Sequence, residues 1–359
     1  MKIAIIGGGP IGCYAAYLLA KEHHDVSIYE NHSQIGAPIQ CTGILTSSFD
    51  EFNIPVEEFL VNTITKIDVN SPNKSLTVKQ KDYVVCRIKF DQYLARMAEN
   101  GGAKIFVNHS FQRKEGNNLI IKHKQEEIST TPDLVIAADG PLSPTAKAYG
   151  FYHKARENYF GIQATVEGNF EPHTIKTYFG ESICPGLFAW ITPESSTTAR
   201  VGLAMKKDSR KYFDKFMKQH GFKVKEMQAG TIPVYHPKQK IKHGNCYVVG
   251  DASSYVKATT LGGIVPAMKQ VEIVVDCIKD GKDVEKELKP VKRKLWTHLK
   301  VQKMFDKFSD KDWDTLIHYV NQPKIQKVFE RYTRDNPIPL ITFALLKEPR
   351  FIKFTKHIF

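Results

Sequence analysis

The chain has 359 residues, of which 42% are hydrophobic and 25% charged, which is typical of a globular protein and excludes a disordered or fibrous one. The formal net charge is +13, and residues 281–359 alone hold 18 Lys and Arg against 10 Asp and Glu. Six cysteines form no Cys-x-x-Cys pair, no apolar run is long enough to cross a bilayer, and the chain begins directly on an apolar strand. We therefore expect reduced thiols, no signal peptide and a cytoplasmic protein.

The first predicted element is a short buried strand over residues 2–6, which runs into the turn Gly-Gly-Gly-Pro-Ile-Gly and a helix over 13–21. In this pattern Gly7 allows the tight turn, Gly9 lets a pyrophosphate approach the backbone, and Gly12 lets the helix pack close to the strand. The N-terminus of the helix offers free N–H groups to phosphates. The spacing predicts a dinucleotide-binding motif.

A second strand supports this prediction, because residues 26–30 end in Glu30, 18 residues after Gly12. A carboxylate at that position accepts hydrogen bonds from the hydroxyls of the adenosine ribose. The elements predicted next are a hairpin within 61–84, a strand over 82–87, a helix over 90–100 and strands over 104–107 and 133–138.

The middle of the chain has short strand patterns with no helix-length segment between them, which indicates a mainly antiparallel sheet. These strands are expected over 160–167, 174–179, 186–191 and 199–205. A helix over 209–220, a strand over 245–249 and a helix that begins near Gly263 follow.

The order of these elements predicts an α/β protein whose Rossmann-like nucleotide-binding domain is split by the antiparallel part. The expected division is 1–60, 85–150 and 225–280 for the nucleotide-binding domain, 61–84 and 151–224 for the substrate domain, and 281–359 for a basic helical C-terminal region broken at Pro337, Pro339 and Pro349.

Two further elements separate FAD from NAD. Asp139-Gly140 ends one buried strand, and Gly250-Asp251-Ala252 ends another. A simple NAD domain needs only the first glycine motif. The element at Asp251, followed by Gly262 and Gly263 at a helix start, resembles the second FAD fingerprint of flavoprotein hydroxylases and reductases, in which the Asp binds the ribityl chain. The three elements in this order predict FAD.

The segment Ile-Gly-Ala-Pro-Ile-Gln-Cys-Thr-Gly over 35–43 resembles a Gly-x-Pro-x-x-Cys segment of the geranylgeranyl reductase family, which includes archaeal digeranylgeranylglycerophospholipid reductases. The resemblance covers roughly residues 1–350 and implies a p-hydroxybenzoate hydroxylase-like fold. It implies that Cys41 and Thr42 lie beside the flavin, that Arg87 contacts the cofactor, and that the backbone at Phe111 contacts adenine.

Two more motifs carry the resemblance. Phe188-Ala-Trp190-Ile-Thr-Pro193 resembles the family's substrate-side motif Tyr-x-Trp-x-Phe-Pro, and Gly262-Gly263-Ile264 resembles the turn at the isoalloxazine. The chain departs from the family where Phe188 and Thr192 replace aromatic residues and where the cysteine loop is one residue shorter. The implied substrate is an isoprenoid lipid, with Phe188, Trp190 and Pro193 on its side of the site.

For such a reaction reduced flavin donates a hydride, and the protein must place the alkene, exclude water and supply a proton. Cys41 is the candidate catalytic residue, as a flavin contact or as the proton donor, although a buried hydrophobic role is the alternative. Tyr235 and His236 are other candidate donors. Phe188 and Trp190 line the substrate channel or belong to the sheet core.

The C-terminal tail is amphipathic, with Phe351, Phe354 and Ile358 near one helical face and basic residues near another. It is expected to lie in the interface of the inner face of the cell membrane or to pack on the enzyme body, and the sequence favours neither.

The leading hypothesis is therefore an FAD-dependent reductase of geranylgeranyl chains on a membrane glycerophospholipid. The alternatives are an FAD-dependent NAD(P)H monooxygenase of an apolar or aromatic substrate, and a non-catalytic lipid-binding flavoprotein. The sequence holds no iron–sulfur ligand set, so electrons come from an external donor: NAD(P)H, ferredoxin or another carrier. No metal-ligand spacing and no nucleic-acid-binding module is found.

Overall fold

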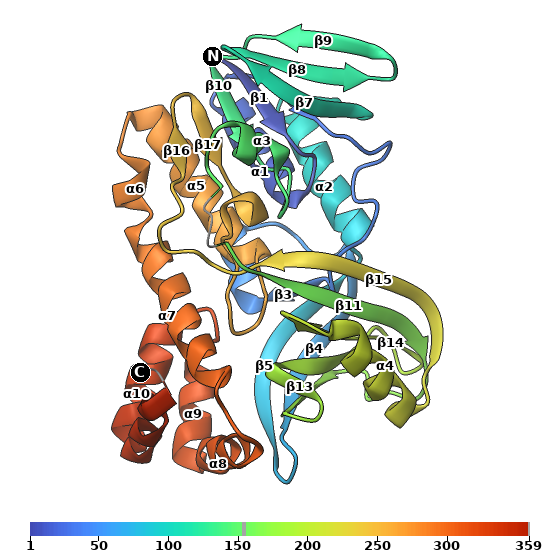
Figure 1. The fold of residues 1–359 in the computed structure, drawn as a ribbon, viewed down its shortest axis with the longest axis vertical. Helices are drawn as coiled ribbons and strands as arrows, with labels where there is room; N and C mark the ends of the chain where they lie inside the picture. The colour runs from blue at the N-terminus through green and yellow to red at the C-terminus, as the bar shows by residue number, and fades with distance from the viewer. Residues whose placement is uncertain (153–155, 358–359) are drawn as a thin grey trace.

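The computed structural model describes residues 1–152 and 156–357, and within them a six-stranded sheet forms the upper part of the molecule (Figure 1). The strand order is β16-β17-β10-β1-β2-β6, with β16 antiparallel to β17 and the other pairings parallel. Parallel strands covered on both faces have continuous apolar sequences, which is why the sequence located β1 and β10 well. The strands are β1 (Lys2–Ile6), β2 (Asp25–Tyr29), β6 (Lys104–Phe106), β10 (Leu134–Ala137), β16 (Lys242–His243) and β17 (Cys246–Val248).

Helix α1 (Pro10–Lys21) follows β1 directly and contacts both α2 (Arg87–Asn100) and α5 (Ile264–Asp280). Its buried face is rich in alanine, which allows close packing on its neighbours. Helix α3 (Pro144–Ala148) and the short helices η1 (Ser47–Phe52) and η2 (Gly250–Ser253) complete this part. A separate sheet of order β7-β8-β9 lies at its edge: β7 (His109–Glu115), β8 (Asn118–His123) and β9 (Glu126–Thr130).

An eight-stranded sheet of order β15-β11-β14-β13-β12-β4-β5-β3 forms the second part, with β4 and β12 parallel and the other pairings antiparallel. The predicted antiparallel region and hairpin are thus confirmed, and the α/β fold class with them. The strands are β3 (Ile44–Thr46), β4 (Leu60–Asn70), β5 (Ser75–Val85), β11 (Asn158–Glu167), β12 (Thr174–Gly180), β13 (Cys184–Pro193), β14 (Thr198–Met205) and β15 (Lys223–Pro233), and α4 (Ser209–His220) follows β14.

Two boundaries differ from the prediction. The strand expected over 82–87 is the end of β5 itself, because β5 pairs with β4 along its whole length to Val85. The boundary expected at residue 225 falls inside β15, which pairs with β11 from Lys223 to Pro233 and so belongs to the eight-stranded sheet.

The C-terminal region is helical, as predicted, and contacts β5, β12 and β13 of the eight-stranded sheet (Figure 1). Pro323, Pro337 and Pro349 each begin a helix here, because the first helical position needs no N–H donor. The break expected at Pro339 is wrong, because Pro339 lies in the first turn of the helix that Pro337 begins, where a missing N–H is still tolerated. The elements are α6 (Val284–Glu287), α7 (Lys289–Phe305), α8 (Asp310–Val320), α9 (Pro323–Arg331), α10 (Pro337–Lys347) and η3 (Pro349–His357). Among the described residues, no helix is both long and apolar enough to cross a membrane.

The tail packs on the enzyme body through Phe354, which is 2% exposed and lies 5.0 Å from the ring of Phe308. Phe351 lies beside the same cluster. Ile358, the third residue of the predicted apolar face, lies outside the described residues. Ile352 and Leu346 point to solvent and are 65% and 69% exposed, so the tail has both a packed and a free apolar side.

Candidate active site

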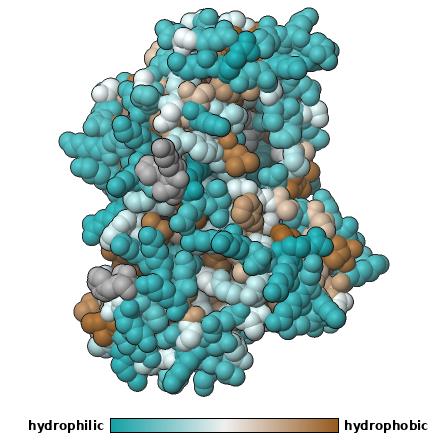
Figure 2. All heavy atoms as spheres, viewed as in Figure 1, coloured by the Kyte–Doolittle hydropathy of each residue, from teal (hydrophilic) through white to brown (hydrophobic). Residues whose placement is uncertain are grey.

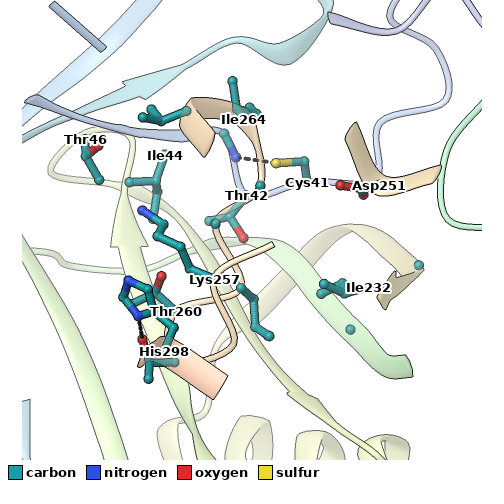
Figure 3. A pocket seen from close by; sticks show the side chains of 18 of the residues that line it. Cys41, Thr42, Ile44, Thr46, Ile232, Asp251, Lys257, Thr260, Ile264 and His298 are labelled. Carbon is teal, nitrogen blue, oxygen red and sulfur yellow. Dashed lines mark hydrogen bonds between the residues drawn. The ribbon is translucent and has the colours of Figure 1, made fainter. Parts of the chain in front are cut away.

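A cavity of about 1080 Å³ is lined by residues from the six-stranded sheet, the eight-stranded sheet and the C-terminal helices. One end lies at the glycine turn after β1 and at Glu30 after β2. The other end is lined by aromatic residues of the eight-stranded sheet and of the C-terminal region, including Phe188, Trp313 and Phe354. The volume is slightly above the usual range of a site for one small ligand. Figure 3 shows the central part of this cavity, where Cys41, Asp251 and Lys257 lie.

The glycine turn has the predicted geometry. Gly7 has φ +104°, and a Cβ on it would lie 2.5 Å from the Ala138 carbonyl oxygen. A Cβ on Gly12 would lie 2.0 Å from the Gly7 carbonyl oxygen, so the helix packs against the turn too closely for a side chain. A Cβ on Gly9 would meet nothing within 4 Å, and Gly9 lines the cavity. The N-terminus of α1 therefore faces open space, as phosphate binding requires.

Glu30 is buried directly after β2 and lines the same end of the cavity. Its carboxylate accepts hydrogen bonds from the Gly8 backbone N–H at 2.6 Å and from the His32 backbone N–H at 2.9 Å. His32 Nδ1 lies 2.6 Å from the same carboxylate. The sequence analysis missed His32, although its position two residues after the expected acid was the available signal. These contacts fix the carboxylate between the glycine turn and the cavity.

Phe111 and Asp139 also line this end. Phe111 is buried on β7, and its side chain belongs to the main core. The Asp139 carboxylate accepts hydrogen bonds from the Ser143 hydroxyl and from the Thr145 backbone N–H, the latter at 3.0 Å. Burial raises the pKa of Asp139 above its ordinary value, and these hydrogen bonds oppose that effect. Asp139 thus holds the start of α3 while it borders the cavity.

The element predicted at Asp251 and Gly262-Gly263 lines the middle of the cavity. Asp251 follows β17, and a Cβ on Gly263 would lie 3.0 Å from its carboxylate oxygen. Ile264 then begins α5, and Figure 3 shows it in the same pocket as Asp251. Burial raises the pKa of the Asp251 carboxyl, and the nearby cations Arg87 and Arg156 lower it. Gly262, Gly263 and Ile264 all line the cavity.

Arg87, the first residue of α2, also lines the cavity. Its guanidinium donates two hydrogen bonds to Asp91, from Nε at 3.1 Å and from Nη2 at 2.9 Å. Burial disfavours the charged guanidinium, but Asp91 and Cys41 outweigh burial and raise the pKa of Arg87. The i,i+4 spacing of Arg87 and Asp91 was a readable signal for this pair. Arg87 is thus a fixed cation beside Cys41 and Asp251.

The cysteine loop is held by residues of the eight-stranded sheet. Cys41 Sγ accepts a hydrogen bond from the Gly43 N–H at 3.3 Å. The Thr42 hydroxyl donates to Gln163 Oε1 at 2.8 Å, and the Arg200 guanidinium donates to the Thr42 carbonyl oxygen. Gln163 and Arg200 lie more than a hundred residues away along the chain, and no local pattern pointed to them.

Phe188 and Trp190 lie two residues apart on β13, so both side chains point to the same face and line the cavity. Their ring centroids are 6.1 Å apart, and Phe179 lies 5.3 Å from Phe188. Pro193 is different. It is buried at the end of β13, its carbonyl oxygen accepts a hydrogen bond from Asn62 Nδ2 at 2.9 Å, and it is not among the residues that line the cavity.

The three candidate proton donors differ in whether they line the cavity. Cys41 lines the cavity, whereas Tyr235 and His236 are absent from its lining among the described residues. Tyr235 is buried, and burial raises the pKa of its hydroxyl. Within residues 1–152 and 156–357, no cluster of three His, Cys, Asp or Glu side chains is arranged to hold a metal ion.

The observed cavity fits FAD in its chemistry. Open space in front of Gly9 and the free N–H groups of α1 suit a pyrophosphate. Glu30 suits a ribose, and Asp251 with the start of α5 suits the flavin end of the molecule. The end of the cavity that is lined by aromatic residues suits a second, apolar ligand.

Comparisons with known proteins agree with this geometry. Residues 5–44 match the family described as NAD(P)-binding Rossmann-like domain, and residues 159–232 match the geranylgeranyl reductase catalytic domain. A digeranylgeranylglycerophospholipid reductase of Methanocaldococcus jannaschii is 32% identical over 89% of this chain and 90% of its own length. Digeranylgeranylglycerophospholipid reductase 2 of Methanothermobacter thermautotrophicus is 28% identical over 88% and 90%.

Solved structures share the fold. A geranylgeranyl bacteriochlorophyll reductase-like protein from Thermoplasma acidophilum superimposes with a TM-score of 0.86 at 21% identity, over 100% of this chain and 99% of that one. The flavin-dependent brominase Bmp2 superimposes with a TM-score of 0.75 at 14% identity, over 99% of each chain. The architecture is thus that of flavin-dependent oxidoreductases.

Proposed function

The chain belongs to the digeranylgeranylglycerophospholipid reductase family, and from this premise we propose that it saturates carbon–carbon double bonds in geranylgeranyl chains of a membrane glycerophospholipid. FAD is its cofactor. The observation that carries the proposal is the cavity, which joins the glycine turn after β1 to the aromatic wall at Phe188 and Trp190. One continuous space has a polar end suited to FAD and an apolar end suited to an isoprenoid chain.

Five groups of this chain would hold the cofactor. The glycine turn with the N-terminus of α1 binds the pyrophosphate, and Glu30 accepts from the ribose. Arg87 and Asp251 border the flavin end, where Gly262 and Gly263 line the cavity next to the start of α5. The Asp91 carboxylate orients Arg87 through two hydrogen bonds, so this cation is fixed before the cofactor arrives.

Reduced FAD supplies a hydride when it is bound, and the chain's residues must place the alkene and deliver a proton. Phe179, Phe188 and Trp190 form an apolar wall with few nucleophiles, which suits positive charge that develops on a tertiary carbon. Cys41 is the proton donor that we favour, because its thiol lines the cavity beside Arg87 and the Gly43 N–H holds its sulfur in place.

The C-terminal region would bring the enzyme to its lipid. Leu346 on α10 and Ile352 on η3 are exposed, and Arg350 and Lys353 lie beside Ile352 in the sequence. Figure 2 shows a hydrophobic patch at the lower left of the surface, where α10 lies in Figure 1. Apolar side chains flanked by cations suit the interface of an anionic membrane. We place a peripheral contact with the inner face of the cell membrane here.

Mass spectrometry of the lipid tests the proposed function. The FAD-loaded protein is reduced with dithionite under anaerobic conditions, which removes any dependence on the natural electron donor, and is incubated with a digeranylgeranyl glycerophospholipid. The expected result is a gain of two hydrogens for each double bond. Unchanged lipid mass with fully reduced, FAD-loaded protein would refute the proposal. In a parallel aerobic incubation with NAD(P)H, incorporation of oxygen into the substrate would instead identify a monooxygenase.

A further inference from the structure

A buried ion pair links the loop before α5 to the C-terminal region. Lys257 Nζ contacts the Asp335 carboxylate, and the two side chains are only 6% and 9% exposed. Lys257 lies between η2 and α5, whereas Asp335 lies between α9 and α10. Removing two charges from water is costly, so a pair that is retained in the interior invites a functional explanation.

Lys257 is fixed to the glycine turn that the FAD site would use. Its backbone N–H donates to the Gly262 carbonyl oxygen at 3.2 Å, and its own carbonyl oxygen accepts from the Leu261 N–H at 2.8 Å. A Cβ on Gly262 would lie 3.1 Å from Lys257 Cε and 3.4 Å from Nζ. The side chain lines the cavity, and Figure 3 shows it reaching toward Ile44.

Two ion pairs lie at this part of the cavity, and in each of them the cation is the member that lines it. Arg334 Nη2 donates to Asp82 at 2.6 Å, and Asp82 is fully buried. Among the described residues that line the cavity, Lys257 and Arg334 are present but their carboxylate partners Asp335 and Asp82 are not. Burial would raise the pKa of Asp335, but the Lys257 ammonium outweighs burial and holds that pKa well below its usual range. Asp335 is therefore ionised at neutral pH, and of this ion pair it is Lys257 that lines the cavity.

His298 is a further titratable group at this cluster, and its Nδ1 lies 2.7 Å from the Thr259 hydroxyl. Burial and the Lys257 charge lower the pKa of His298 to about 3. His298 is therefore neutral near pH 7 and adds no charge to the wall. The ammonium beside Gly262 is thus, in addition to Arg87, a positive group next to the expected position of the isoalloxazine.

We propose that Lys257 tunes the cofactor by stabilising the anionic reduced state of FAD, and that Asp335 positions Lys257 and moderates its charge. The proposal rests on the proposed function. Reduction of FAD by two electrons with uptake of one proton adds one negative charge to the isoalloxazine. A fixed cation in a poorly solvated wall favours that state, and a carboxylate behind the cation opposes it. The wall thus sets how readily the enzyme accepts electrons.

The test measures the midpoint potential of bound FAD at pH 7.5 with dithionite and reference dyes. Lys257→Met is expected to disfavour reduction at least tenfold, which for a two-electron couple is a potential about 30 mV lower. Asp335→Asn is expected to move the potential in the opposite direction. Lys257→Arg keeps the charge and should restore the wild-type value. If the ion pair had only a structural role, the two substitutions would not shift the midpoint potential in opposite directions.

Lys257→Met leaves Asp335 buried and unpaired, which lowers the stability of the variant. The double variant Lys257→Met/Asp335→Asn removes both charges. The difference between its midpoint potential and that of Asp335→Asn isolates the effect of the ammonium. We again expect reduction to be disfavoured at least tenfold. Equal potentials in these two variants, or shifts of one sign in both single variants, would overturn the inference. Failure of the wild-type protein to bind FAD would overturn the proposed function as well, whereas unmoved potentials in a lipid-saturating enzyme would overturn only the role of Lys257.

Discussion

At the scale of single residues, two glycines in one turn have separable roles. The added Cβ at Gly12 would collide with the Gly7 backbone, whereas the added Cβ at Gly9 would enter the empty space of the cavity. Gly9 also has φ −69° and ψ 177°, a backbone conformation that alanine adopts without strain. The fold therefore requires a glycine at position 12, whereas the requirement that we propose at position 9 comes from the ligand.

This difference gives a matched pair of variants. Gly9→Ala should leave the free energy of unfolding of the protein without cofactor within about 0.5 kcal/mol of wild type, yet weaken FAD binding roughly tenfold or more. Gly12→Ala should destabilise the fold by about 1–3 kcal/mol. Urea unfolding and fluorescence titration with FAD measure the two quantities. Normal FAD affinity in Gly9→Ala would show that the pyrophosphate does not lie there.

His298 is buried and neutral, which makes stability depend on pH. Its pKa is lowered from 6.5 to about 3 in the folded protein, so the unfolded chain binds the proton more readily. Stability from this group is therefore complete above pH 6.5 and is lost as the pH falls toward 3.

Between pH 7 and pH 5 the wild-type protein should lose about 2 kcal/mol more stability than His298→Asn, which cannot take up that proton. Urea unfolding at both pH values checks the difference. The same loss in both proteins would show that another group is responsible.

At the scale of elements, features that depend on a local sequence pattern were predicted better than contacts between distant segments. The β1 turn, α4 and the helix start at Ile264 follow from short periodic segments and glycines, and the sequence located them. The contact of Thr42 with Gln163 and the pairing of β4 with β12 join segments that lie far apart in the chain, so no local propensity encodes them. The Lys257–Asp335 pair was unpredictable for the same reason, since neither residue has a local signature.

The helix η3 combines a packed and a free apolar side, which two substitutions separate. Phe354→Ala should destabilise the protein by about 3–5 kcal/mol, because Phe354 packs against Phe308 and Tyr319. Ile352→Ala should change stability by less than about 0.5 kcal/mol. The same Ile352 substitution should reduce cosedimentation with anionic vesicles, and undiminished binding would place the membrane contact elsewhere.

At the scale of the whole molecule, two sheets and a helical region meet around one cavity. The six-stranded sheet and α1 form its polar end, the eight-stranded sheet and the C-terminal helices form its aromatic end, and the loop before α5 lies between them. The sequence indicated both ends through separate motifs. Pro193 was also expected on the substrate side, but it is not among the described residues that line the cavity, because a strand motif does not say which of its residues face the site.

If cofactor and lipid meet in this cavity, an anaerobic single-turnover experiment will show electrons passing from one to the other. Stoichiometrically reduced FAD-enzyme is mixed with the unsaturated lipid while the flavin absorbance is followed and the lipid is quantified. We expect one flavin to be reoxidised for each double bond that is saturated. Flavin that stays reduced in the presence of excess lipid, or that reoxidises while the lipid remains unsaturated, would contradict this expectation.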